Sequence, residues 1–203
     1  MTIVLADLDG VLVDSQASIA RAWTWWARRH GLDGDVVEAV QHGRPSGEII
    51  ESLRPELDAH AESLAIDARQ AHDTEGVVAL PGALGLFAAF GLDRLAVVTS
   101  CTVPLATARL AAAGLPRPQV LVTPERLRRG KPDPEGYLLA ARRLGAEPAD
   151  CVVLEDAPAG VAAGRAAGMR VVGILTTHAA ADLEDADETV PTVAAWLAAH
   201  AVL

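Results

Sequence analysis

Short apolar runs alternate with helical patterns along most of the chain. Residues 3–6 form the first run, and the polar residues and glycine that follow at once predict a buried strand ending in a turn. Four further runs have the length and composition of strands buried on both faces of a parallel sheet. These are residues 95–98, 120–122, 152–154 and 171–175.

Helical patterns separate these predicted strands. Three segments are rich in alanine and leucine, have a proline near the start and are followed by glycine, as capped helices often are. They are residues 104–113, 134–144 and 158–167. Repeated strand and helix units of this size predict an α/β fold with a parallel sheet covered on both faces. In such folds, ligands bind beyond the carboxyl ends of the strands.

Residues 16–79 interrupt this alternation, because they contain helical patterns and turns but no convincing strand. Apolar residues recur at helical spacing in two stretches, so each predicted helix has one apolar face. They are Ile19, Trp23, Trp26 and His30 in the first and Leu57, Ala61, Leu64, Ala68 and Ala71 in the second. The pattern predicts a small α-helical cap over residues 16–79, inserted after the first strand of a core formed by residues 1–15 and 80–203.

Composition and charge narrow the class of protein. The 203 residues are 51% hydrophobic, which is ample for a buried core, and 27 acidic against 17 basic side chains give a net charge of −10. Without a long basic run, nucleic acid is not an expected partner. The absence of a long apolar stretch or leader, with only Cys101 and Cys151 as cysteines, predicts a cytoplasmic protein with no membrane association. The oligomeric state stays open.

Acidic residues follow the first predicted strand. Asp7 lies just past the strand, where it is placed as a nucleophile, and Asp9 lies two residues on, within reach of the same substrate for proton transfer. The stretch from Asp7 to Ser15 resembles the first motif of the haloacid dehalogenase-like superfamily. The dehalogenases of that superfamily lack an acid at the position of Asp9, so its presence points to phosphoryl chemistry.

Three further stretches at predicted strand ends resemble the other motifs of the superfamily. Thr99 and Ser100 match the second, and Lys131, within Gly-Lys-Pro-Asp-Pro, matches the third. Lys131 is the only lysine of the chain, and a compact ammonium group needs less room beside a phosphoryl group than an arginine fork. Glu155 and Asp156 match the fourth motif. Asp156 is also a candidate N-cap for the next helix, which does not exclude metal binding.

The resemblance covers essentially the whole chain and implies a Rossmann-like parallel sheet with the cap of the phosphoglycolate phosphatase and β-phosphoglucomutase branch. It implies a Mg²⁺-dependent phosphatase that hydrolyses a small phosphorylated metabolite, such as a sugar or polyol phosphate, through an aspartyl phosphate. The catalytic residues would be Asp7, Asp9, Thr99 and Lys131, with Leu8 and Ser100 contacting the phosphate. The magnesium site would comprise Asp7, the Asp9 carbonyl, Asp156 and, through a water, Glu155.

Cap residues are the candidates for substrate selection. The polar turn that contains His42 and Arg44 interrupts the predicted helices and resembles the corresponding stretch of sugar and polyol phosphate phosphatases. A solvated surface turn is an equally good interpretation. Trp25 lies off the apolar face of its helix and is a candidate to line the cleft, whereas Trp23 and Trp26 are expected in the core of the cap.

Three alternative functions share parts of this pattern. β-Phosphoglucomutases carry a histidine where this chain has Ile19, which favours a hydrolase over a mutase. A phospho-aspartyl regulatory module also uses an aspartate, a hydroxyl and a lysine, but the Asp7 and Asp9 spacing, the cap and the chain length argue against it. A phosphonate-cleaving relative would need a lysine in the cap, and residues 16–79 contain none.

Overall fold

In the computed structural model, which describes residues 2–33 and 46–200, six strands form one parallel sheet. The order is β5-β4-β1-β6-β7-β8, and all five adjacent pairs are parallel. The strands are β1 (Ile3–Ala6), β4 (Leu95–Val98), β5 (Val120–Val122), β6 (Cys151–Glu155), β7 (Arg170–Ile174) and β8 (Glu188–Val190). The predicted α/β fold with a Rossmann-like parallel sheet is confirmed.

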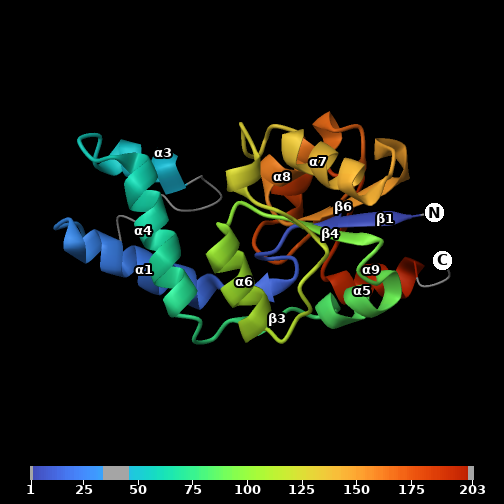
Figure 1. Ribbon diagram of the computed structural model, residues 1–203, viewed down its shortest axis with the longest axis horizontal. Coiled ribbons are helices and arrows are strands. Elements are labelled where there is room, and N and C mark those ends of the chain that lie inside the picture. Colours follow the sequence, from blue (N-terminus) through green and yellow to red (C-terminus); the bar gives the residue numbers. More distant parts are fainter. Residues whose placement is uncertain (1, 34–45, 201–203) are drawn as a thin grey trace.

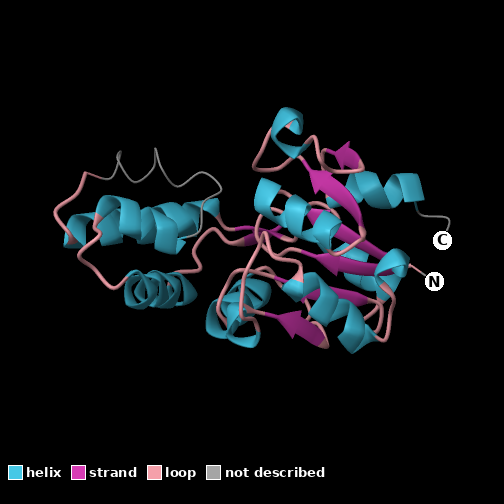
Figure 2. Cartoon of the chain, turned by 90° about the horizontal axis from the view of Figure 1, so that it is seen from above, coloured by secondary structure: helices cyan, strands magenta, loops and turns pink. Residues whose placement is uncertain are grey.

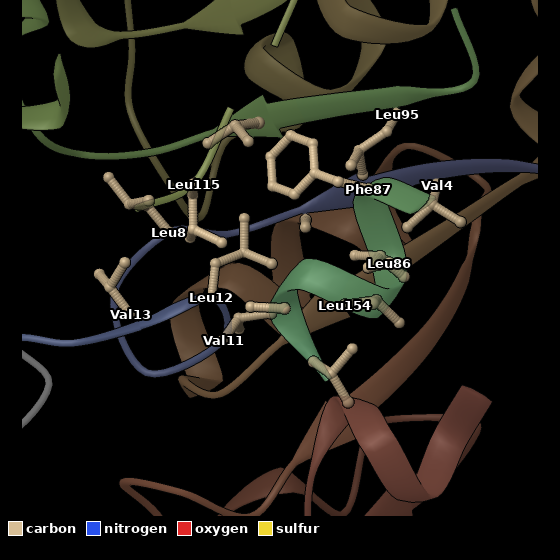
Figure 3. Packing of buried hydrophobic residues seen from close by; sticks show 14 of the residues in the cluster. Val4, Leu8, Val11, Leu12, Val13, Leu86, Phe87, Leu95, Leu115 and Leu154 are labelled. Carbon is tan, nitrogen blue, oxygen red and sulfur yellow. The ribbon is translucent and has the colours of Figure 1, made fainter. Parts of the chain in front are cut away.

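Side chains of the central strands alternate between two apolar clusters, because successive residues of a strand point to opposite faces. Val4 belongs to the cluster shown in Figure 3, and its neighbour Leu5 belongs to the cluster on the other face. On the first face lie α5 (Ala83–Phe90), α6 (Val103–Ala112) and α9 (Val193–His200); on the second lie α7 (Glu135–Leu144) and α8 (Pro158–Ala166). Figure 1 shows the layers, with α7 and α8 on one side of the strands and α5 and α9 on the other, and Figure 2, turned by 90°, shows the strands side by side.

The helices of the cap lie to one side of the sheet (Figure 1). They are α1 (Gln16–Arg29), α3 (Ser46–Leu53) and α4 (Ala59–His72), and they enclose an apolar cluster of their own. Trp23 and Trp26 belong to this cluster, as predicted. An antiparallel pair of short strands, β2 (Val13–Asp14) and β3 (Val78–Ala79), connects the cap to the core. The exact domain boundaries stay a prediction.

Some elements were missed by the sequence pattern: α5, α9, β8, the short pair β2 and β3, and three short 3₁₀ helices, η1 (Pro124–Arg126), η2 (Pro148–Asp150) and η3 (Ala180–Leu183). β3 corrects the expectation that residues 16–79 contain no strand; it is only two residues long, too short to form an apolar run. α5 is almost uniformly apolar and packs against α9, so the periodicity that marks an amphipathic helix is missing. β8 is an edge strand with two polar residues, so it is not an apolar run. In the described part of the chain, no helix is both long and apolar enough to cross a membrane.

We predict that β1 dominates the stability of the core. Leu5 is fully buried in the central strand, so Leu5→Ala should lower the free energy of unfolding by about 2–5 kcal/mol through lost contacts and a cavity. The matched variant Leu84→Ala, whose leucine is 56% exposed on α5, should change it by no more than about 0.5 kcal/mol. Urea unfolding followed by circular dichroism measures both. Equal losses would contradict the assignment of the core.

Candidate active site

Asp7 lies at the carboxyl end of the central strand. Its backbone N–H donates to the carbonyl oxygen of Leu154 at 3.0 Å, which continues the pairing of β1 with β6 beyond the end of β1. The side chain is buried, with 8% exposure. The first predicted catalytic residue therefore lies where parallel α/β sheets bind their ligands.

Lys131 brings a positive charge to this carboxylate from the loop before α7. Its Nζ contacts Asp7 Oδ1 and donates to Glu155 Oε1 at 2.5 Å and to the carbonyl oxygen of Val98 at 3.1 Å. All three donor positions of the ammonium group thus have partners. The structure brings together one residue each from the first, third and fourth motifs.

Both carboxylate oxygens of Glu155 accept hydrogen bonds within the protein. Tyr137 donates its hydroxyl to Oε1 at 2.8 Å, and the backbone N–H groups of Asp156 and Ala157 donate to Oε2 at 3.0 and 3.2 Å. A Cβ on Gly160 would come within 1.7 Å of Oε1, so only glycine leaves room for this carboxylate at the start of α8. Glu155 therefore orients Lys131 and the turn after β6, while its predicted contact with a metal through water stays a prediction.

Asp156 lies against the tight turn that follows Asp7. Gly10 has a left-handed backbone with φ of 77°, and a Cβ there would come within 2.0 Å of Asp156 Oδ2. The hydroxyl of Thr177 donates to the same carboxylate oxygen, and the ring of His178 lies 2.9 Å from the Asp156 carbonyl oxygen. Gly10 thus allows the loops after β1, β6 and β7 to meet.

Asp9 is directed toward a different set of partners. Its Oδ1 accepts from the hydroxyl of Ser15 at 2.6 Å, and its Oδ2 accepts from the thiol of Cys101 at 2.9 Å and from the guanidinium of Arg109. The side chain is 23% exposed, more than that of Asp7. Asp9 therefore retains access to solvent while three donors fix its orientation.

The remaining predicted phosphate contacts lie at the same edge of the sheet. Thr99, which follows β4, is buried, and its hydroxyl accepts from the N–H of Cys101 at 3.1 Å. Ser100 is exposed beside it. The side chain of Leu8 is fully buried in the cluster of Figure 3, so only its backbone can face a ligand.

The acidic residues outnumber the cations near Lys131, and their pKa values respond accordingly. Burial, with the charges of Glu155 and Asp9, raises the pKa of Asp7 to about 7 even though Lys131 lowers it. Burial and the charges of Glu155 and Asp7 raise the pKa of Asp156 well above its usual value. Burial alone would lower the pKa of Lys131, but Asp7 and Glu155 hold it well above its usual range. The site therefore holds more acidic than basic side chains and has a formal excess of negative charge when all of them are ionised.

This charge distribution suits a hard cation. Within the described ranges, no group of three or more His, Cys, Asp or Glu side chains is arranged to hold a metal ion. The carboxylates of Asp7 and Asp156 nevertheless lie on neighbouring loops, and burial together with the neighbouring carboxylates raises the pKa of each, so a cation bound between them would stabilise their ionised forms. Mg²⁺ is commonly held by one or two carboxylates, with waters and substrate phosphate completing the shell, so the donor set fits Mg²⁺.

The cap candidates are only partly described. His42 and Arg44 lie outside the described residues. Trp25 lines an open groove on the cap together with arginines of α1 and α4, and the guanidinium of Arg29 lies 5.7 Å from the centre of its ring. None of the residues from the four motifs lines this groove, so Trp25 does not border the candidate active site there.

Four residues of the site were missed by the sequence analysis: Ser15, Arg109, Tyr137 and Thr177. Thr177 follows a predicted strand, so its position at the carboxyl edge was a usable signal. Arg109 falls on the apolar face of a predicted helix, between Ala106 and Leu110, and a charge there is a second signal. Ser15 and Tyr137 carry no comparable signal, because the contact of Ser15 depends on the turn between β1 and β2 and that of Tyr137 on how α7 meets the end of β6.

Comparisons with known proteins agree with the four motifs. The family model of the haloacid dehalogenase-like hydrolases matches residues 1–168. Hexitol phosphatase A of Escherichia coli is 48% identical over 178 residues, which cover 84% of this chain and 81% of that protein. Validoxylamine A 7'-phosphate phosphatase of Streptomyces hygroscopicus is 38% identical over 196 residues, covering 91% of each chain.

A solved structure also resembles the whole fold. The crystal structure of a hydrolase from Pseudomonas syringae superposes with a TM-score of 0.84 at 26% identity, covering 99% of this chain and 98% of the other. The similarity extends over both the sheet and the cap, since the coverage includes nearly the entire chain.

The raised pKa of Asp7 predicts a pH-dependent stability in metal-free buffer. The unfolded chain ionises Asp7 near pH 3.8 and the folded protein near pH 7, so between these values only the folded form holds this proton. The free energy of unfolding should therefore fall as pH rises through this window, by at most a few kcal/mol, since one pKa unit corresponds to about 1.4 kcal/mol.

Asp7→Asn should weaken this pH dependence and leave the part that the raised pKa of Asp156 contributes, whereas Asp185→Asn, which alters an exposed carboxylate, should retain the wild-type slope. Urea unfolding at a series of pH values between 4 and about 8, with a chelator present, measures the slopes. Equal slopes for wild type and Asp7→Asn would show that Asp7 is not the group responsible.

Proposed function

The chain belongs to the haloacid dehalogenase-like hydrolases, and on that basis we propose that it hydrolyses sugar or polyol phosphates through a phosphorylated Asp7. The family match and the names of its relatives support the coarser statement that it is a phosphoric monoester hydrolase. The finer statement rests on one observation: the Asp7 carboxylate lies at the end of β1 in contact with Lys131, with a second acid two residues on.

In the first half-reaction, a carboxylate oxygen of Asp7 attacks phosphorus, and the bond from phosphorus to the ester oxygen breaks. Asp9 gives its proton to the departing alkoxide, so the alcohol leaves neutral. Lys131 faces the developing negative charge, and the hydroxyl of Thr99 and the N–H of Ser100 serve as neutral donors to the phosphoryl oxygens.

In the second half-reaction, water attacks the phosphorus of the aspartyl phosphate. Asp9, now ionised, accepts a proton from this water, and the bond to Asp7 breaks to release phosphate and restore the Asp7 carboxylate. The backbone of Leu8 borders the phosphate between the two acids. Each cycle consumes one ester and one water and yields one alcohol and one phosphate, and Asp9 ends in its starting form.

Mg²⁺ would be held by the carboxylates of Asp7 and Asp156 and the backbone carbonyl of Asp9, with Glu155 acting through a water. Bound there, it supplies positive charge that stabilises the phosphoryl oxygens and the ionised form of Asp7. This assignment is supported by the excess negative charge of the site.

The substrate class follows from the relatives and from the cap. Two relatives are named hexitol phosphatase A and validoxylamine A 7'-phosphate phosphatase, and the first name supports a substrate with several hydroxyl groups. We expect His42 and Arg44 to contact those hydroxyls. Ile19 has no titratable group and packs against the apolar cluster of the cap, which supports hydrolysis over the mutase alternative.

The function is tested by measuring release of free phosphate from a panel of hexitol, sugar and polyol phosphates with Mg²⁺ present. We expect at least one hexitol or sugar phosphate to be hydrolysed. Asp7→Asn should lower turnover by roughly 10⁴-fold or more, as loss of a covalent nucleophile does in other hydrolases. Asp9→Asn should lower it by roughly 100-fold or more.

Asp185→Asn, which changes an exposed carboxylate far along the chain, should retain wild-type turnover in the same assay. Turnover by Asp7→Asn at the wild-type rate would exclude the proposed nucleophile. Isomerisation of a sugar phosphate without release of phosphate would identify a mutase instead.

Mg²⁺ binding has a readout that does not depend on activity. A ligand that binds only the folded form raises the melting temperature, so Mg²⁺ should stabilise the wild type in thermal unfolding. The increase should be smaller in Asp156→Asn and unchanged in Asp185→Asn, at constant ionic strength. An equal increase in wild type and Asp156→Asn would place the bound ion elsewhere.

A further inference from the structure

Arg109 is a buried cation on the apolar face of α6. Its exposure is 2%, and Leu105, Ala106 and Leu110 are the buried residues beside it on that helix. A charge removed from water in this way is tolerated only when other groups compensate for the lost hydration. What its guanidinium contacts is therefore informative.

The guanidinium joins two parts of the protein that are far apart in sequence. Nη1 contacts the carboxylate of Asp9 and lies 2.8 Å from Sγ of Cys101, while Nη2 contacts the side-chain oxygen of Gln70. Asp9 belongs to the loop after β1, whereas Gln70 is buried on α4 of the cap. One side chain thus connects the acid of the candidate active site to a cap helix.

A second polar contact between α4 and α6 bypasses Asp9. The carboxylate of Asp67, one turn before Gln70, accepts from the backbone N–H of Thr102 at 3.3 Å, at the start of α6. The two helices pack against each other. α4 therefore offers one residue that reaches Asp9 through Arg109, and another whose hydrogen bond to α6 does not include Asp9 although its charge acts on both Arg109 and Asp9.

We propose that Arg109 is a positioning residue that orients the Asp9 carboxylate and makes this orientation depend on the placement of the cap. The proposal rests on the function proposed above, in which Asp9 transfers protons in both half-reactions. Ser15 fixes one carboxylate oxygen and Arg109 fixes the other, so the carboxylate cannot rotate without breaking a contact. Movement of α4 that withdraws Gln70 frees one end of the guanidinium and loosens Asp9.

This arrangement predicts a specific kinetic signature. With p-nitrophenyl phosphate, the leaving group departs without needing a proton, so a badly oriented Asp9 slows only the attack of water on the aspartyl phosphate. Each enzyme molecule then releases about one molecule of p-nitrophenol quickly, which is the burst, and releases further product slowly at the steady-state rate. Loss of stability alone would reduce the amount of active enzyme but would not separate the two phases.

The variants are Arg109→Met, which retains an apolar stem of similar length, Gln70→Leu, and the double variant. Asp67→Asn is the control for charge, since it keeps an oxygen that can accept from the N–H of Thr102 and removes only the charge of Asp67, which acts on both Arg109 and Asp9. Each is examined by stopped flow with p-nitrophenyl phosphate and Mg²⁺, by kcat and KM for the preferred polyol phosphate, and by thermal unfolding.

We expect Arg109→Met to lower kcat for the polyol phosphate about tenfold or more with little change in KM. General acid-base catalysis contributes roughly 100-fold or more, and a badly oriented Asp9 should lose part of that contribution. Its burst should be large relative to its steady-state rate. Gln70→Leu should also lower kcat and raise the ratio of burst to steady-state rate, but by less. The double variant should have the kcat of Arg109→Met, because Gln70 acts through Arg109. Asp67→Asn, which leaves the contacts of Arg109 with Asp9 and Gln70 in place, should retain the wild-type ratio of burst to steady-state rate.

If Arg109→Met does not fold, Arg109→Lys and Gln70→Leu decide the question, because a lysine can reach Asp9 or Gln70 but has no fork to hold both. Arg109→Lys should then retain part of the wild-type kcat. Adding Gln70→Leu to Arg109→Lys should not lower kcat further. Wild-type kcat in Arg109→Met, or additive effects of Arg109 and Gln70, would overturn the inference. A wild type without phosphatase activity would instead overturn the proposed function, and this inference with it.

Discussion

The carboxyl edge of the sheet holds its buried carboxylates because one ammonium group lies between them. Lys131 contacts Asp7 and Glu155, and Glu155 is only 1% exposed. Two carboxylates so close to each other and so far from water would repel strongly without a shared cation. The ammonium group also donates to the end of β4, so it ties the charges to the backbone of the sheet. The only lysine of the chain lies here, although the chain contains sixteen arginines.

The same edge is left with more negative than positive charge, and the register of the sheet is the reason. β1 pairs with β6 so that Ala6 lies opposite Leu154, which places the residues after them, Asp7 and Glu155, side by side. Gly10 then lets the loop after β1 approach Asp156 more closely than any other residue allows. The fold therefore concentrates carboxylates at a cost in stability, a pattern typical of functional sites and suited to a cationic cofactor and an anionic substrate.

The sequence predicted the parts of this fold that depend on local pattern. Five strands were recognisable because burial on both faces makes each of them a short apolar run, whereas β8 lies at an edge and α5 is apolar throughout. Asp7, Lys131 and Asp156 were recognisable because they follow predicted strands or are unique in composition. The contact of Arg109 with Asp9 was not, since the two residues lie one hundred residues apart in sequence and only the packing of α6 brings them together, although a charge on an apolar helix face was a signal for Arg109 itself.

Asp9 is held from two directions, and both lead to the cap. On one side the loop after β1 passes directly into β2, where Gly10 donates to the carbonyl of Val13 and the hydroxyl of Ser15 binds the Asp9 carboxylate. On the other side Arg109 reaches the same carboxylate from α6 while contacting Gln70 of α4. The cap begins one residue after Ser15, so its first helix and its last are both connected to this acid. Under the inference drawn above, a displacement of the cap that withdraws Gln70 would change the support that Arg109 gives Asp9, and the position of the cap would then be a condition for proton transfer and not only a barrier to water.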